Sequence, residues 1–133
     1  MSARFTRRFE AKPEHIDELG HVNNIVWLGW AQDIATSHWK ARADPAHVED
    51  YFWVVTRHEV DYRGNIGAGE AVTAETWIPD APRGARFDRC VSFSDDAGKV
   101  LVSVRSTWAM LDKASGRLVR IRPDVASAFL AEG

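Results

Sequence analysis

The segment DELGHVNN, residues 17–24, stands directly before the apolar, aromatic-rich stretch IVWLGWA, residues 25–31. A helical pattern runs over residues 23–41, so we expect the polar segment to form the loop that leads into a helix. The first N–H groups of a helix have no partners within it and can receive negative charge. The loop therefore places a carboxylate, an imidazole and two amides beside free backbone donors.

The helix has no polar face in its first half, which predicts that protein surrounds it on all sides. Its second half gains polar side chains, so we expect that end to approach solvent. These are Asp33, Thr36, Ser37, His38 and Lys40.

Strand patterns flank this helix. Residues 3–10 are expected to form a first strand that ends before Pro13. The polar residues 43–50 are expected to connect the helix to the strands that follow. Further strands are expected over residues 52–62, 70–78, 85–94 and 99–111, with a closing helix over 123–130. Alternation in the first of these predicts one shared face for Val54, Thr56, His58, Val60 and Tyr62. The fold class is α+β, a long antiparallel sheet of about five strands wrapped around one central helix.

Composition narrows the class of protein. The chain has 133 residues, 45% hydrophobic, 27% charged, with a net charge of -2. These values predict a single domain, residues 1–133, with no nucleic-acid partner. There is no signal-peptide pattern and no run near the ~18 apolar residues of a membrane span, so we expect a cytoplasmic protein without membrane contact. The one cysteine, Cys90, excludes an intrachain disulfide, and no residues show metal-ligand spacing.

Six tryptophans in so short a chain are typical of large flat contacts, so we expect self-association. The long strands and the apolar half-helix support this expectation, because one subunit has too little surface to bury them. A homodimer or a homotetramer is predicted.

A general base beside an oxyanion site is the minimum equipment for hydrolysing an acyl compound. Asp17 is the candidate base. His21 and Asn24 are candidates for orienting it or for holding water or substrate. The simpler interpretation is structural, since Asp is common in turns and Asn23 is a natural helix cap.

The pattern Asp17-x-x-Gly20-His21-Val22-Asn23-Asn24 resembles the hotdog-fold acyl-CoA thioesterases of the 4-hydroxybenzoyl-CoA thioesterase type. A second segment, from Val54-Val55 to Glu59-Val60-Asp61-Tyr62 and on to Gly69-Glu70, is similar to that family's strand leading into a Gly-Asp/Glu turn. The resemblance extends over about residues 3–130. One difference is Trp27, where the family commonly has tyrosine.

The resemblance implies hydrolysis of an acyl-CoA, or an acyl-carrier-protein thioester, without metal or organic cofactor. Asp17 would be base or nucleophile, and the backbone at Gly20, Val22 and Asn23 would bind the oxyanion. Substrate contacts would fall to Trp27, Glu59, Arg83 and Arg86, although Glu59 also fits a solvated surface ion pair. Two other functions remain open: a non-catalytic acyl-CoA binding protein, and a hotdog hydratase or dehydratase.

Overall fold

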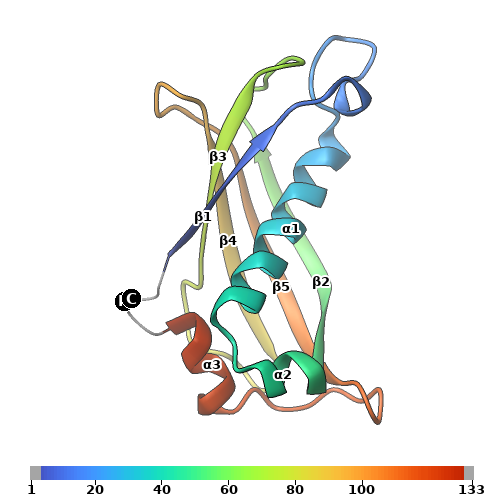
Figure 1. Cartoon of the computed structure of the whole chain (residues 1–133), viewed down its shortest axis with the longest axis vertical. Helices are drawn as coiled ribbons and strands as arrows, with labels where there is room; N and C mark the ends of the chain where they lie inside the picture. Colours follow the sequence, from blue (N-terminus) through green and yellow to red (C-terminus); the bar gives the residue numbers. More distant parts are fainter. Residues whose placement is uncertain (1–3, 131–133) are drawn as a thin grey trace.

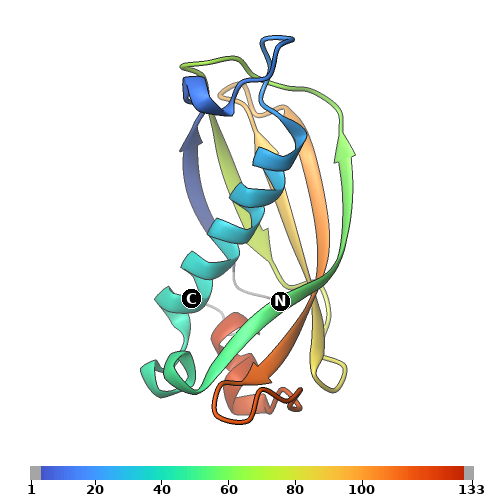
Figure 2. The ribbon, with the colours of Figure 1, turned by 90° about the vertical axis from the view of Figure 1, so that its right-hand side faces the viewer.

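A five-stranded antiparallel sheet curls around one long helix (Figures 1 and 2). The structure is a computed structural model that describes residues 4–130. The strands pair in the order β1-β3-β4-β5-β2, so β1 and β2 are the sheet edges. The strands are β1 (Phe5–Glu10), β2 (Tyr51–Tyr62), β3 (Ala71–Trp77), β4 (Arg86–Ser94) and β5 (Val100–Asp112). The helices are η1 (Pro13–His15), α1 (Asn24–Arg42), α2 (Pro45–Asp50) and α3 (Pro123–Leu130). The expected strand count, antiparallel pairing and closing helix are confirmed.

Helix α1 starts within one residue of the expected position because Asn23 caps it. The Asn23 side-chain oxygen accepts the N–H of Ile25 at 3.1 Å, which satisfies one of the free donors of the first turn. The helix packs Trp27, Trp30 and Ile34 against the sheet. Burying such side chains is the main source of its stability, since helices in proteins are stabilised mostly by tertiary packing.

The prediction that protein surrounds the first half of α1 is wrong for a single chain. Ile25 is 68% exposed, and Gly29 is also exposed. The sheet covers one side of the helix only, which leaves an apolar side uncovered. At the other end the polar pattern was misleading for His38, which is fully buried, although Asp33, Thr36 and Lys40 are exposed as expected.

Strand β2 changes face midway. Its register against β5 shifts between Val55 and Arg57, so Thr56 forms a bulge. Before the bulge Trp53 and Val55 are half-buried, whereas Val54 and Thr56 are exposed. The expected single face for Val54 through Tyr62 is therefore wrong, because one inserted residue moves the side chains before it to the opposite face.

The link over residues 43–50 contains a short helix that the sequence interpretation missed. Asp44 caps α2 by accepting the N–H of Ala46 at 2.9 Å, and Pro45 stands at its first position. Helices α2 and α3 lie together at the end of the molecule opposite the loop that precedes α1 (Figure 1). The polar loop therefore lies at one end of the molecule, and the two short helices lie at the other.

Candidate active site

The loop before α1 is a tight turn organised by Asp17. The backbone N–H of Asp17 donates to the carbonyl of His21 at 2.8 Å, and the pair Ile16–Val22 closes the loop. The Asp17 carboxylate uses one oxygen, Oδ1, to accept the N–H groups of Leu19 at 2.9 Å and His21 at 3.3 Å. Gly20 has φ +82°, a conformation that favours glycine. The carboxylate is half-buried and held in place, and Oδ2 has no hydrogen-bond partner within residues 4–130.

The backbone donors expected at Gly20, Val22 and Asn23 are already engaged. The Gly20 N–H donates to the Asp17 carbonyl at 3.0 Å, and the Asn23 N–H donates to the carbonyl of His15 at 3.0 Å. The Val22 N–H lies 3.2 Å from the Ile66 carbonyl and 3.1 Å from the Asn65 side-chain oxygen. This corrects the expectation that these three groups are free. The partners of Gly20 and Asn23 lie in or directly before the loop, whereas those of Val22 come from a distant segment of the chain.

The free donor at the start of α1 is the backbone N–H of Asn24, which has no hydrogen-bond partner among the described residues. It is the first N–H of the helix, at the positive end of the helix dipole. The site therefore offers one fixed carboxylate and one unpaired amide donor on a single short stretch of chain.

Asn65 is a positioning residue that the sequence interpretation missed. Its side-chain amide accepts the N–H of Val22 at 3.1 Å and donates to the Val22 carbonyl at 3.1 Å, as another strand would. Tyr62 adds a hydrogen bond from its hydroxyl to the Asn24 carbonyl at 3.1 Å. These contacts join the Asp17 loop to the end of β2 and the segment after it. An Asn within the glycine-rich stretch that follows β2 was the available signal.

The side chains of His21 and Asn24 are exposed. Neither makes a side-chain hydrogen bond to another described residue, so both are free to meet a ligand or a second subunit. Within residues 4–130, no group of three His, Cys, Asp or Glu side chains is placed to hold a metal ion.

Trp27 and Glu59 lie outside this loop. Trp27 is fully buried and packs edge-to-face with Trp30 and Phe93, so it is a core residue and not the substrate contact that the resemblance implied. Glu59 is exposed on β2 and pairs with Arg57 at 2.5 Å. The alternative interpretation of Glu59 as a solvated surface ion pair is thus the one the geometry favours.

Arg83 lies in the turn between β3 and β4, and Arg86, the first residue of β4, pairs with it across that turn. That turn lies at the opposite end of the molecule from the Asp17 loop (Figure 2). Arg83 pairs with Asp88 at 3.1 Å, whereas Arg86 is exposed. Within one chain both arginines therefore lie at the end of the molecule away from the Asp17 loop.

A cavity of about 260 Å³ lies near α2 and α3 and is bordered by Phe52 and Trp53 of β2. The Asp17 loop contacts the other end of the same strand through Tyr62. The two candidate parts of a site, base and cavity, therefore sit at opposite ends of one edge strand.

Comparison with known proteins identifies the family to which the chain belongs. A family model described as the acyl-ACP thioesterase N-terminal domain matches residues 2–129. The chain belongs to the acyl-ACP thioesterase family. A curated relative, the chloroplastic palmitoyl-acyl carrier protein thioesterase of Gossypium hirsutum, is 33% identical over 78 residues, which cover 58% of this chain and 19% of the relative. The match thus spans about a fifth of that relative's length.

Solved structures confirm the hotdog fold of this family. An acyl-ACP thioesterase from Bacteroides thetaiotaomicron is similar at TM-score 0.77 and 24% identity, over 87% of this chain and 49% of that one. A hypothetical protein from Staphylococcus aureus, solved in complex with CoA, is similar at TM-score 0.84 and 12% identity, over 96% and 82%. The family shown is the acyl-ACP thioesterases, and the more specific 4-hydroxybenzoyl-CoA type is not established. None of the helices over residues 4–130 has the length and hydrophobicity needed to span a membrane.

Proposed function

We propose that the chain hydrolyses acyl thioesters, releasing a carboxylic acid and a free thiol, with an acyl-CoA as substrate. The observation that carries this proposal is the Asp17 carboxylate, fixed through Oδ1 in the loop that leads to the free N–H of Asn24. Membership of a thioesterase family supports the same reaction.

In the proposed reaction Asp17 acts as general base or as nucleophile. As base it takes a proton from water while the water oxygen bonds to the thioester carbonyl carbon. The carbonyl oxygen gains negative charge, which the Asn24 N–H at the helix start stabilises. The carbon–sulfur bond then breaks, and the thiolate leaves and recovers a proton. As nucleophile, the Asp17 carboxylate bonds to the carbonyl carbon and the carbon–sulfur bond breaks, which releases the thiolate and leaves an anhydride that water hydrolyses.

We propose that the working unit is a homodimer, or a homotetramer built from such dimers, joined along the edge strand β2. An antiparallel pairing of two β2 strands would place the Tyr62 end of one strand beside the Phe52 end of the other. Asp17 of one subunit would then face the cavity of its partner. The uncovered side of α1 and the exposed Phe52 and Val54 support an apolar partner at this edge.

The proposal is tested by measuring free thiol released from a panel of short, long and aromatic acyl-CoAs. Turnover well above buffer is expected for at least one. Binding of acyl-CoA without thiol release from any thioester would instead favour the acyl-CoA binding protein. Loss of enoyl-CoA absorbance without thiol release would favour a hydratase.

A second substrate class is favoured by the family match, since both the matching model and the curated relative are named for acyl carrier protein. Hydrolysis of one acyl group presented on CoA and on acyl carrier protein distinguishes them. A higher kcat/KM for the carrier-protein thioester would assign that substrate.

A further inference from the structure

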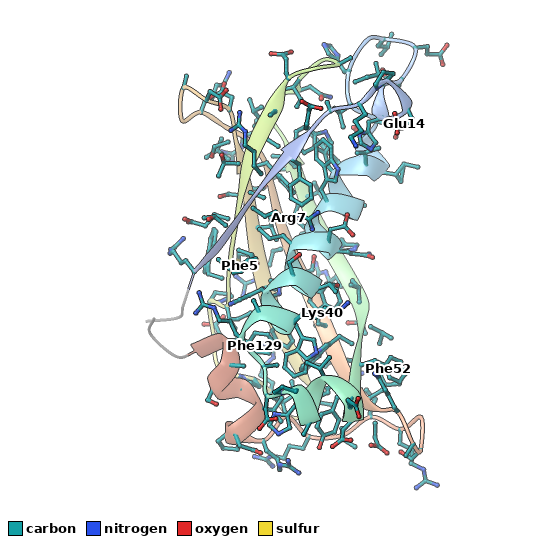
Figure 3. All side chains as sticks on the ribbon, viewed as in Figure 1. Phe5, Arg7, Glu14, Lys40, Phe52 and Phe129 are labelled. Carbon is teal, nitrogen blue, oxygen red and sulfur yellow. The ribbon has the colours of Figure 1, made fainter. Side chains whose placement is uncertain are left out.

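The cavity at the α2 and α3 end has walls that are mostly aromatic. Lys40, Phe52 and Phe129, three of its bordering residues, come from three different elements at this end of the molecule (Figure 3). Its aromatic side chains include Trp39, Trp53, Phe87, Trp108 and Phe129. Such a lining suits the apolar body of a ligand.

One lining residue, Arg89, carries a charge, unlike the aromatic side chains around it. It is 2% exposed, and its Nη1 donates to His38 Nδ1 and Thr76 Oγ1, both at 3.0 Å. Its guanidinium stacks 5.1 Å from the centre of the Phe129 ring. No carboxylate within residues 4–130 pairs with it. A buried guanidinium without an anion is unfavourable, and burial lowers the pKa of Arg89 to about 9.

Three residues that line the cavity also have buried donors without an acceptor. Arg89 Nε, Trp53 Nε1 and Trp108 Nε1 are buried nitrogen atoms without a hydrogen-bond partner, and all three residues line this cavity. The lining contains two further cations, Lys40 and Lys113, and no Asp or Glu. Buried donors need acceptors, and cations without nearby carboxylates favour an anion.

We propose that this cavity binds an apolar molecule that carries a carboxylate, with the carboxylate beside Arg89. The aromatic walls hold the apolar part, and a carboxylate oxygen pairs with the guanidinium. If the proposed function and the β2 dimer hold, on which this extension rests, the molecule is the acyl group of the substrate. Its thioester would lie at the cavity mouth near the partner's Asp17, and its acidic end would reach Arg89.

Binding of octanoate and of octanol to the whole protein tests the proposal without any need for turnover. The fluorescence of the tryptophans lining the cavity reports both ligands. Octanoate is expected to bind at least tenfold more tightly than octanol. Equal affinity would overturn the proposal, because the two probes differ only in the carboxylate.

Two variants locate the site. Arg89→Met is expected to weaken octanoate binding at least tenfold and to leave octanol binding unchanged. The control is Arg105→Gln, at an exposed arginine of β5, which is expected to change the binding of neither ligand. Thr36→Trp fills the cavity from an exposed position of α1 without touching the Arg89 contacts, so it remains informative if Arg89→Met does not fold. Unchanged octanoate binding in Thr36→Trp would overturn the proposal.

Kinetic measurements distinguish two sources of the bound carboxylate: the distal end of the acyl group, or the acid released by hydrolysis. Octanoyl-CoA is compared with the mono-CoA thioester of suberic acid, which has the same chain length and a second, distal carboxylate. A kcat/KM at least tenfold higher for the suberyl thioester assigns a distal carboxylate. Equal rates together with tight octanoate binding assign the carboxylate of the product acid. Octanoate binding with no hydrolysis of any thioester would contradict the proposed function alone and leave the cavity proposal supported.

Discussion

The Arg89 guanidinium donates from Nη1 to Nδ1 of His38 at 3.0 Å, and both side chains are buried between α1 and the sheet. Because Nδ1 accepts this hydrogen bond, His38 is neutral and carries its proton on Nε2. Burial, together with the charges of Arg89 and Arg42, lowers the pKa of His38 to about 3. A buried histidine next to a cation is thus a source of acid sensitivity.

The free energy of unfolding is expected to fall by about 2 kcal/mol between pH 6 and pH 4 through His38 alone. In this range the unfolded chain binds a proton at His38 and the folded chain does not, so acid favours unfolding. The loss should be complete only near pH 3. Urea unfolding of wild type and His38→Gln at several pH values measures it, since Gln can accept from Arg89 and does not titrate. Equal pH dependence in the two proteins would contradict this assignment.

Asp17→Asn is expected to reduce thioester turnover on the order of 10²-fold or more while leaving the fold intact. The amide keeps an oxygen that can accept the N–H groups of Leu19 and His21, but it cannot act as a base or nucleophile. The matched control is Asp33→Asn, on an exposed carboxylate of α1. Steady-state rates and circular dichroism are compared. Turnover of Asp17→Asn within a few-fold of wild type would remove this residue from the mechanism.

Gly20→Ala is expected to lower the free energy of unfolding by about 1 kcal/mol or more, because φ is +82° at this position. There is open space around the site, so the cost comes from the backbone and not from a clash. Gly20→Asn should cost less, since Asn tolerates this conformation better than Ala. Denaturant titration compares the three proteins. If Ala and Asn have the same effect, backbone strain is not the cause.

Val54→Asp is expected to dissociate the proposed assembly, because a charge on the exposed face of the edge strand must be desolvated in any contact there. Val54 is 37% exposed, and Leu118→Asp, at a residue 49% exposed outside β2, is the control. Analytical ultracentrifugation gives the masses, and thiol release gives the activity. A wild-type protein that is monomeric and fully active would contradict the shared site.

Much of the fold followed from local patterns. The cap at Asn23, the helix after it, the closing helix and the positions of the strands along the chain could be predicted, because each depends on neighbours a few residues apart. The order of the strands in the sheet could not, because β1 pairs with β3 and β2 pairs with β5. The position of the bulge at Thr56 could not be predicted from the sequence. It depends on how β2 and β5 align over their whole length, which no short window of sequence records.

The sequence by itself determined the Asp17 loop, whose internal hydrogen bonds join residues at most four apart. Only the tertiary structure decided which donors stay free, since Val22 is bound by Asn65, 43 residues away, and Asn24 is left unpaired. The same holds for the Arg89–His38 contact, which spans 51 residues. Hydrogen bonds within a turn are encoded by adjacent residues, whereas those between segments depend on how strands and helices pack.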